Sequence, residues 1–479
     1  MENRMFSFWF NQSIAWVCLI GCLSIGSIQA QAPDFQKMTP AERTAYMTKM
    51  REASQADWQV MMDKLSLKLP TLPPPAEDPK RPQHLKQKEG STNWFDEAGN
   101  NHVRSGWGNW TNYDDAKAND YKLLNPLVLK NGKSVKDAAT WWKQRRPEIL
   151  NDYLTEIFGK TPENTPTVTF APTGTDSTVL AGKAIRKTIL GRIDNTRYPS
   201  VNPGIPVTYY RPVNTSGKIP MMVIVWGSFP QPMPSIEKLI DAGWAVALVN
   251  TGSIQMDSGA GLHEGIIGLM NGGKDRKPDE WGVLSAWSWG LSRVLDHFEK
   301  DNGINAKQIG IEGHSRWGKT ALLAGALDAR WAIVFASCSG SLGASLEKRN
   351  FGETIDNVAS SGEYHWMAGN FLKYGGHWDA MPVDSHELMA LIAPRPLFIT
   401  GGTKDLWADP KGEFLACVAA SPVYTLLGKK GLSTTEMPTP DVALIDSDIA
   451  FRNHEGGHVD ILDWPTFLEF AQRQFKLKK

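Results

Sequence analysis

The sequence predicts an α/β fold in which a mostly parallel sheet is covered by helices on both faces. Three observations support this prediction. The 479 residues have an ordinary globular composition, with 41% hydrophobic and 21% charged residues. Short β-branched and aromatic runs bounded by Gly and Pro begin near residue 167. From about residue 280 helix and strand patterns alternate, so ligands are expected at the carboxyl ends of parallel strands.

The first thirty residues are typical of a secretory signal. Arg4 precedes an apolar run over residues 14–25, and Ala30 stands before a polar stretch, so cleavage after Ala30 is expected. The run LIGC offers an alternative, a lipoprotein acylated at Cys22, although apolar residues continue past that cysteine. No other segment approaches ~18 uninterrupted apolar residues, so we expect a secreted or periplasmic protein without an integral membrane span.

Residues 31–120 are predicted to form an N-terminal extension before the main domain at 121–479. A polar stretch with helical spacing over residues 39–68 is followed by the proline-rich LPTLPPPAEDPKRPQ. In the main domain, aromatic and aliphatic residues recur at helical spacing from residue 137 to 158, with a kink expected at Pro147.

The remaining elements are predicted from periodicity and from bounding Gly and Pro residues. Strands are expected at residues 167–171, 207–213, 221–226, 245–250, 308–312, 332–337, 397–400 and 442–445. Helices are expected at residues 281–300, 319–326, 412–420 and 464–475. A long insertion separates the strand at 332–337 from the one at 397–400.

Charge and cysteine content exclude several classes of partner. The 51 basic residues balance the 51 acidic residues, which leaves no basic field for nucleic acid. Outside the signal only Cys338 and Cys417 remain, and they could form a disulfide or stay as thiols. Two cysteines without a neighbouring ligand pattern make no zinc site. We expect a monomer with no metal and no other cofactor.

The stretch GHSRWGKT at residues 313–320 matches two functional patterns. As G-x-x-x-x-G-K-[ST] it resembles a phosphate loop, but its loop residues HSRW are mostly bulky and would hinder backbone N–H groups from curling round phosphates. The alternative places Ser315 on the tight strand-to-helix turn of an α/β-hydrolase fold. Trp317 stands where the G-x-S-x-G pattern has its second Gly, and Gly318 follows it. A helix N-cap is the structural alternative for Ser315.

Candidate acids and bases follow Ser315 in the chain order of α/β-hydrolases. Asp405 lies just past a predicted strand, with Asp409 as a substitute, and NHEGGHVD offers His454 and His458. The same segment matches the zinc motif H-E-x-x-H, which requires both histidines on one face of a helix. Adjacent glycines cost about 1 kcal/mol each in a helix, so we favour His458 as a base above Ser315. Helix capping is the structural alternative for Asp405.

In combination these motifs resemble the glucuronoyl esterases, carbohydrate esterases that cleave the ester between lignin alcohols and glucuronic acid side chains of xylan. The resemblance is carried by GHSRWGK followed by TALLAGALDAR, by GTKDLWADPKGEF and by GGH, and extends from about Trp141 to the last helix. The family turn reads G-x-S-R-x-G-K, which accounts for Gly318. The resemblance implies a bacterial-type member that acts on glucuronoxylan or lignin–carbohydrate esters.

The resemblance also implies roles for individual residues. Ser315 resembles the nucleophile, His458 the general base, and Arg316 the side chain that stabilises the oxyanion. Three further residues match family positions that contact the sugar, namely Lys319, Glu363 and Trp407, and Glu353 is an additional candidate nearby.

One position departs from the family pattern. Many members carry the acid 23 positions after the serine, where this chain has Cys338. We therefore expect Asp405 to complete a Ser-His-Asp triad. Two alternatives remain: an acetyl xylan or other carbohydrate esterase on the same scaffold, and a carbohydrate-binding protein with a vestigial triad, which the cysteine would favour.

Overall fold

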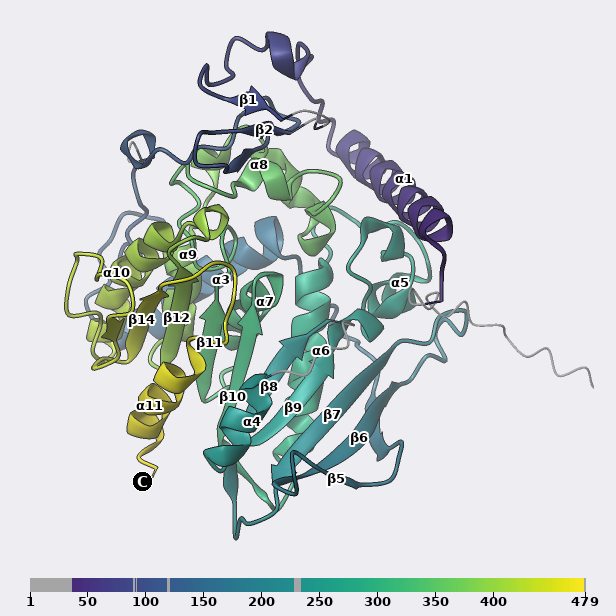
Figure 1. Ribbon diagram of the computed structural model, residues 1–479, viewed down its shortest axis with the longest axis vertical. Coiled ribbons are helices and arrows are strands. Elements are labelled where there is room, and N and C mark those ends of the chain that lie inside the picture. Colours follow the sequence, from purple (N-terminus) through teal and green to yellow (C-terminus); the bar gives the residue numbers. More distant parts are fainter. Residues whose placement is uncertain (1–36, 89–90, 92, 119–120, 228–233, 478–479) are drawn as a thin grey trace, which may run out of the picture. The chain divides into compact units, whose positions relative to one another are not determined.

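A large mixed sheet forms the centre of the computed structural model, which describes residues 37–88, 91, 93–118, 121–227 and 234–477 (Figure 1). Its parallel strands are β8 (Ile219–Trp226), β9 (Ala245–Asn250), β10 (Ile304–His314), β11 (Ile333–Ser337), β12 (Leu397–Gly402) and β14 (Ile449–His454). Antiparallel pairing adds β4 (Val168–Pro172), β5 (Ser177–Val179), β6 (Ala184–Ile193), β7 (Gly204–Pro212) and β13 (Ala443–Leu444). The predicted signal, Cys22 included, lies outside the described residues.

The strand order places the loops that follow the parallel strands at one edge of the sheet. The order is β13-β14-β12-β11-β10-β8-β9-β7-β6-β4, with β5 paired to β6. The six parallel strands are therefore contiguous, and their carboxyl ends share one edge. The predicted α/β-hydrolase class, a mostly parallel sheet between helices, is confirmed.

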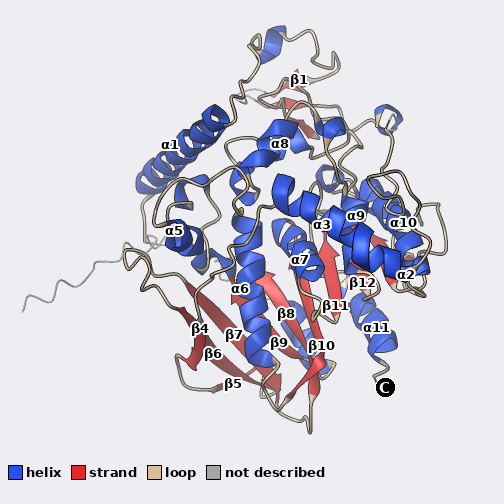
Figure 2. Ribbon diagram, turned by 180° about the vertical axis from the view of Figure 1, so that it is seen from behind, coloured by secondary structure: helices blue, strands red, loops and turns tan. Residues whose placement is uncertain are grey.

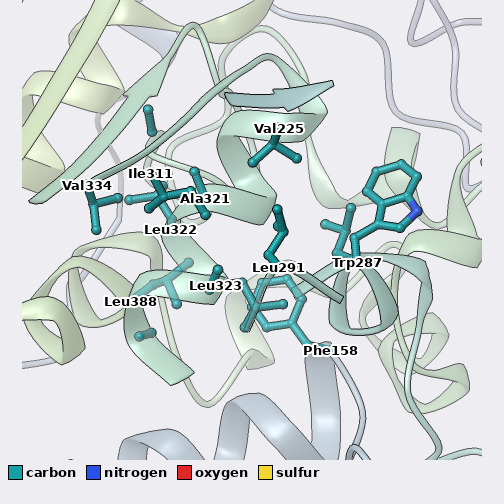
Figure 3. Close-up of a cluster of buried hydrophobic side chains, with 14 of the residues drawn as sticks. Phe158, Val225, Trp287, Leu291, Ile311, Ala321, Leu322, Leu323, Val334 and Leu388 are labelled. Carbon is teal, nitrogen blue, oxygen red and sulfur yellow. The ribbon is translucent and has the colours of Figure 1, made fainter. Parts of the chain in front are cut away.

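Helices cover both faces of the central strands, as Figures 1 and 2 show from opposite sides. The covering helices include α4 (Pro234–Asp241), α6 (Val283–Phe298), α7 (Arg316–Leu327) and α11 (Trp464–Phe475). Side chains alternate along a strand, so each strand contributes to two cores. Met221, Val223 and Val225 of β8 pack in the core of α6 and α7, whereas Met222 and Ile224 pack in the core of α4 and α11. Figure 3 shows the first core, where Ile311 lies near Leu322.

Further helices lie before the sheet and in the connections. They are α1 (Pro40–Lys64), α2 (Ala138–Thr140), α3 (Arg146–Asp152), α5 (Gly265–Asn271), α8 (Ile355–Val358), α9 (Ser385–Ile392) and α10 (Pro410–Leu426). Around α3 the helix expected at 137–158 continues through π-helical turns at Trp141–Arg145 and Tyr153–Ile157. Pro147 is the second residue of α3, which directly follows the π-helical turn Trp141–Arg145. None of the described helices is both long and apolar enough to cross a membrane.

The last predicted strand is only partly correct. At 442–445 the structure has β13, a two-residue antiparallel strand, and the parallel strand before the histidine loop is β14. The sequence IAFRNH of β14 mixes apolar and polar residues and gave no clear strand pattern. The long strand β6 was also not predicted, because its charged residues interrupt the apolar alternation.

The N-terminal extension packs on the insertion between β11 and β12, residues 338–396. In α1 the Trp58 indole donates to the Ala359 carbonyl (2.9 Å), and farther along Asn112 Nδ2 donates to the Asn350 carbonyl (2.7 Å). Between these contacts lies a small sheet of β1 (Lys86–Gln87), β2 (Trp94–Phe95) and β3 (Asn101–His102). The domain boundary at residue 120 stays a prediction, since Thr39–Lys479 cluster as one unit.

Candidate active site

Ser315 occupies a strained turn between β10 and α7. Its φ of 60° and ψ of −131° are rare for a residue with a side chain and typical of a nucleophile elbow. The Ser315 N–H donates to the Ser337 carbonyl (2.9 Å), and the Gly318 N–H donates to the Ser315 carbonyl (2.8 Å). The helix expected to start at Lys319 begins at Arg316. The serine therefore stands at the carboxyl edge of the sheet.

Two glycines permit the close packing of α7 against the elbow and against the residues after β11. A Cβ on Gly313 would lie 2.0 Å from the Trp317 carbonyl oxygen, and one on Gly318 would lie 2.9 Å from Ser339 Cβ. The second glycine that this tight packing requires is therefore Gly318. Residue 317 can be large, and its indole stacks on Trp226 with ring centroids 5.7 Å apart. This packing explains the departure from the generic G-x-S-x-G pattern.

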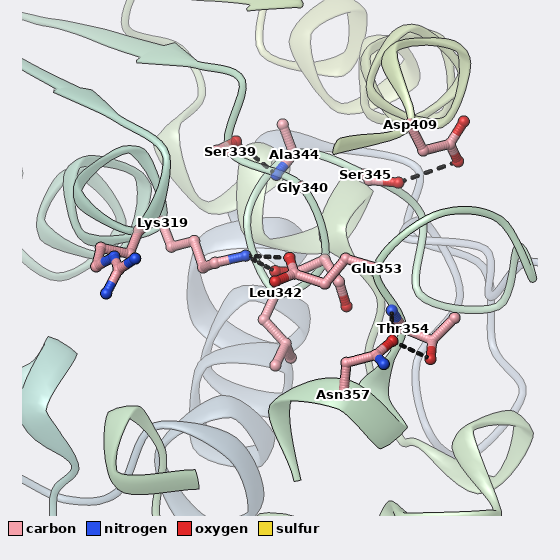
Figure 4. Close-up of polar contacts among 12 residues, drawn as sticks. Lys319, Ser339, Gly340, Leu342, Ala344, Ser345, Glu353, Thr354, Asn357 and Asp409 are labelled. Atoms are coloured by element: carbon pink, nitrogen blue, oxygen red, sulfur yellow. Dashed lines mark hydrogen bonds and ion pairs between the residues drawn. The ribbon is translucent and has the colours of Figure 1, made fainter. Parts of the chain in front are cut away.

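The same turn does not make a phosphate loop. Lys319 is only 3% exposed, and its Nζ donates to Glu353 Oε2 (2.6 Å) and to the Ser341 carbonyl (2.5 Å), as Figure 4 shows for the glutamate. A phosphate-loop lysine must be free to reach the ligand's phosphates. We therefore reject the phosphate-loop interpretation.

A cavity of about 370 Å³ lies above Ser315. Its lining contains the eight residues that the sequence favoured for catalysis or sugar binding: Ser315, Arg316, Lys319, Glu353, Glu363, Asp405, Trp407 and His458. They come from the elbow, the insertion and the loops after β12 and β14. The structure thus brings together residues that lie up to 143 positions apart, counted from 315 to 458.

Asp405 and His458 meet above two neighbouring parallel strands. Asp405 follows β12 and His458 follows β14, and His458 Nδ1 lies 2.6 Å from Asp405 Oδ2. The loops are joined by the Lys404 N–H, which donates to the Gly456 carbonyl (2.7 Å). A carboxylate that accepts a hydrogen bond from Nδ1–H fixes the tautomer in which Nε2 is the acceptor nitrogen. The imidazole side chain is 44% exposed, and the carboxylate is almost buried.

Asp409, the substitute acid, has a different position. Its side chain is 1% exposed and accepts from Arg349 Nε (2.9 Å) and from the Gly412 N–H (3.0 Å), where it caps α10. Burial raises the pKa of Asp409 to about 6, although the Arg349 charge opposes this shift. It does not line the cavity, so the geometry favours Asp405.

The H-E-x-x-H segment does not form a helix. His454 ends β14 and is fully buried, with Nδ1 2.9 Å from Asp463 Oδ2 and Nε2 3.0 Å from the Gly457 carbonyl oxygen. Both of its ring nitrogens are therefore occupied. A zinc site of the H-E-x-x-H kind needs two histidines one helical turn apart, so we reject that interpretation.

Cys338 lies beside the acid and base as a free thiol. Cys338 and Cys417 are both buried and unbonded to each other, which excludes the disulfide alternative. One ligand atom each from Cys338, Asp405 and His458 lie within 4.8 Å of one another. Burial raises the pKa of the Cys338 thiol well above its usual range, with nearby carboxylates adding to the shift. The neutral thiol leaves Asp405 as the charged partner of His458.

Glu363 contributes an unusual acid to the cavity. Burial raises its pKa to about 8, the Glu353 carboxylate adds to the shift, and Lys319 and Arg316 oppose it. Within the described residues Glu363 Oε2 has no hydrogen-bond partner. Glu363 is therefore neutral near pH 7 and can donate a hydrogen bond to a ligand.

A charged cluster behind Arg316 was missed in the sequence. Arg316 Nη1 donates to Asp257 Oδ2 (2.9 Å), while the other carboxylate oxygen accepts from His365 Nε2 (3.0 Å) and Trp366 Nε1 (2.6 Å). Burial would raise the pKa of Asp257, but these hydrogen bonds and the neighbouring positive charges lower it below its usual range. The Arg316 guanidinium also lies 5.1 Å from the Trp366 ring centroid. The Asp257 carboxylate and the Trp366 ring therefore both hold the Arg316 side chain in place.

His314 is a second residue that the sequence did not single out. Its ring centroid lies 4.4 Å from that of His458, and its Nδ1 is 3.3 Å from Ser337 Oγ. Burial lowers the pKa of His314 to about 3, and the neighbouring His458 adds to the shift. His314 therefore stays neutral beneath the exposed imidazole. In the sequence, only its position directly before Ser315 could have indicated that His314 lies in the site.

Comparisons with known proteins agree on one family. A family model of fungal glucuronyl esterases matches residues 214–428. A carbohydrate esterase from an unknown prokaryotic organism is 32% identical over 403 residues, which cover 75% of this chain and 91% of the relative. A 4-O-methyl-glucuronoyl methylesterase from Cerrena unicolor is 31% identical over 65% of this chain and 63% of its own length.

Solved structures give the same result. A CE15 glucuronoyl esterase from Teredinibacter turnerae has a TM-score of 0.76 and 34% identity, and the match covers 88% of this chain and all of that chain. A glucuronoyl esterase from Solibacter usitatus has a TM-score of 0.70 and 34% identity, over 76% of this chain and all of that one.

Proposed function

For this chain, which belongs to the glucuronoyl esterases of carbohydrate esterase family 15, we propose that Ser315, His458 and Asp405 form the triad of a uronate ester hydrolase. The observation that carries the proposal is the 2.6 Å contact between His458 Nδ1 and Asp405 Oδ2 in the cavity that Ser315 lines. A base held by a buried carboxylate beside a serine on a strained turn is the arrangement that acyl transfer requires.

The proposed reaction has two halves. His458 Nε2 takes the Ser315 proton as Oγ attacks the ester carbonyl, and the resulting imidazolium is stabilised by Asp405. The imidazolium then protonates the departing alkoxide, which leaves an acyl-enzyme. Water, deprotonated by the same nitrogen, attacks the acyl-enzyme and releases the uronic acid and Ser315.

Arg316 is proposed to stabilise the oxyanion. A uronate ester is uncharged, and negative charge develops on its carbonyl oxygen only during reaction. A fixed guanidinium therefore binds the transition state better than the substrate. Oxyanion donors in other enzymes contribute about 3 kcal/mol to catalysis. The contact with Asp257 supports this role, because it holds Arg316 in place before the substrate arrives.

The sugar ring is proposed to bind against the insertion and the loop after β12. The third N–H of Lys319, which the bonds to Ser341 and Glu353 leave over, and neutral Glu363 offer hydrogen-bond donors. Glu353 offers acceptors, and Trp407 offers a flat apolar face. The substrate that fits these groups is the glucuronic acid side chain of xylan esterified to a lignin alcohol, as in the family's known activity.

Replacing the nucleophile tests the proposal. Ser315→Ala should abolish hydrolysis of benzyl and methyl glucuronate without altering the circular dichroism spectrum. A purified Ser315→Ala variant that keeps this activity would contradict the triad. Acetylated xylan and simple acyl esters, assayed in parallel, separate the uronate esterase from other carbohydrate esterases on this scaffold. Labelling of wild-type Ser315 by a fluorophosphonate probe excludes a vestigial triad.

We also propose that the mature protein is exported, on the basis of the N-terminal signal. Mass spectrometry of the exported protein should find a chain that begins after Ala30. A lipid-modified chain that begins at Cys22 would instead identify a lipoprotein.

A further inference from the structure

We infer that the N-terminal extension forms a second binding cleft, for the uncharged sugar chain that carries the uronate ester. The inference rests on the proposed function, which places the uronate in the catalytic cavity. This extension cleft has a volume of about 420 Å³, within the range of roughly 300–1,000 Å³ that small-ligand sites occupy. Its lining includes His84, Asp96, Trp110, Tyr113, Lys117 and Asn350.

The extension cleft and the catalytic cavity share a wall. Asn350 lines the cleft, Glu353 lines the cavity, and the two are three residues apart in the insertion. Asn112 of the extension holds this wall at two points, because its Nδ2 donates to the Asn350 carbonyl (2.7 Å) and its carbonyl accepts from the Gly352 N–H (2.9 Å). Residues 350–353 therefore separate the two sites by a short stretch of chain, and a sugar chain that leaves the catalytic cavity over this wall would enter the extension cleft.

The wall lies on the sugar side of the catalytic cavity. The Glu353 N–H donates to the Trp407 carbonyl (2.8 Å), and the Glu353 carboxylate binds Lys319. These three residues are among the four assigned to the sugar ring. The leaving alcohol must instead lie beside His458, which protonates it. The part of the substrate that reaches the extension cleft is thus the sugar chain and not the alcohol.

The charges of the extension cleft favour a neutral ligand. Lys80 and Lys117 are balanced by Asp96 and Asp114, and Lys117 Nζ lies 3.1 Å from Asp114 Oδ2. Asp96 accepts hydrogen bonds from Asn100. A cleft with two cations and two anions has no net attraction for a charged polymer. An unsubstituted sugar chain, which carries hydroxyl groups and no charge, meets this condition.

Aromatic rings connect the cleft to the shared wall. His84 and His102 are edge-to-face with centroids 6.1 Å apart, His102 and Tyr113 follow at 4.9 Å, and Tyr113 and Phe351 at 5.9 Å. Among these rings that of His84 is exposed, and that of Tyr113 is partly exposed. Exposed ring faces between amide and hydroxyl groups suit sugar rings, which have apolar faces and polar edges.

Binding of a xylo-oligosaccharide without any uronate tests the cleft independently of catalysis. In the Ser315→Ala background of the full chain, xylohexaose should shift NMR signals of the extension. His84→Ala and Lys117→Ala should each weaken its affinity by about fivefold, since each removes one contact. Gln83→Ala, an exposed neighbour outside the lining, is the matched control and should bind normally. Absence of binding, or equal affinity in all variants, overturns the inference.

Kinetics distinguish the sugar chain from a polyphenol. His84→Ala should lower kcat/KM about fivefold for an ester of a xylo-oligosaccharide that bears the glucuronoyl group, and should leave benzyl glucuronate unchanged. A loss confined to esters of bulky lignin-type alcohols would place a polyphenol in the cleft and overturn the inference. Inactivity of the wild type on every uronate ester would contradict the proposed function, whereas xylohexaose binding would remain.

Discussion

Asp405 and Asp409 lie on the same loop but have opposite surroundings. Asp405 contacts an exposed imidazole, whereas Asp409 is buried against Arg349 and the first turn of α10. Asp405→Asn should therefore lower kcat by roughly 10³- to 10⁴-fold with little change in stability, because the amide favours the wrong histidine tautomer. The loss of activity is measured as kcat on benzyl glucuronate, and the stability is measured as the midpoint of urea unfolding.

Asp409→Asn is the matched comparison. It removes one of the two carboxylates that bind the buried Arg349 and leaves the other, that of Asp115, so we expect a loss of about 2 kcal/mol in the free energy of unfolding. Its kcat at low temperature, where the variant is folded, should stay within about tenfold of wild type, far above that of Asp405→Asn. The reverse pattern would make Asp409 the acid of the triad.

Glu363 makes substrate binding depend on pH. Its raised pKa, about 8, means that the carboxyl is neutral below pH 8 and ionised above it. Ionisation removes the donor and adds a second negative charge beside Glu353, so KM for benzyl glucuronate should rise as the pH passes 8. Glu363→Gln, which cannot ionise, should lack this step. Persistence of the step in the variant would assign it to another group.

Asp257 is expected to act by positioning Arg316. Asp257→Asn removes the charge that holds the guanidinium, which can then turn toward the carboxylates of the cavity. We expect kcat to fall by about 10- to 100-fold with KM nearly constant, as for the loss of an interaction made in the transition state. His365→Gln, which removes a donor from the other carboxylate oxygen, should cost less. Equal losses of kcat in both variants would indicate a general structural role.

Sequence patterns identified the site residues that belong to a motif and missed those that act behind them. Ser315, Arg316 and Lys319 share one short stretch, and Asp405 and His458 occur in the expected chain order. Asp257 stands alone in a loop and gains its role only because folding brings it to Arg316. In the segment EYHWM the sequence analysis singled out Glu363 only. No pattern in this segment indicated that His365 and Trp366 bind Asp257.

At the scale of one element, the elbow between β10 and α7 stores conformational strain. The backbone of Ser315 lies in a region that costs roughly 1–3 kcal/mol for residues with a side chain but little for glycine. Ser315→Gly should therefore unfold at higher denaturant concentration than Ser315→Ala. We expect a difference of about 1 kcal/mol, because glycine also gains entropy when unfolded. Both variants should be inactive, and an alanine variant as stable as the glycine variant would argue against strain.

The strands show where element prediction fails. The apolar strand β8 is buried on both faces, and its hydrophobic run predicted it directly. In contrast, β14 ends in Arg452, Asn453 and His454, and the first and last of these bind Asp463 just before α11. These polar residues obscure the pattern of the strand that carries them, and the prediction fell on the neighbouring β13.

At the scale of the whole molecule, the extension and the insertion are expected to unfold together. Buried Asp356 of α8 accepts hydrogen bonds from Ser105 Oγ (3.0 Å) and Asn109 Nδ2 (2.8 Å) of the extension. Calorimetry of the mature chain should therefore show one transition. Asp356→Asn should lower its midpoint by about 2 °C, the effect of one weakened buried contact in a large chain. Two separate transitions would show that the extension folds independently.

The pairing of Lys319 with Glu353 and of Arg316 with Asp257 has a consequence for turnover. Hydrolysis converts a neutral ester into an anion, and an anion leaves slowly from a site with unmatched positive charge. Here the Lys319 and Arg316 side chains of the cavity already have counter-ions, so the uronate product is expected to bind only weakly. Product inhibition by free glucuronate should be slight, and the enzyme can keep working as the acid accumulates around it.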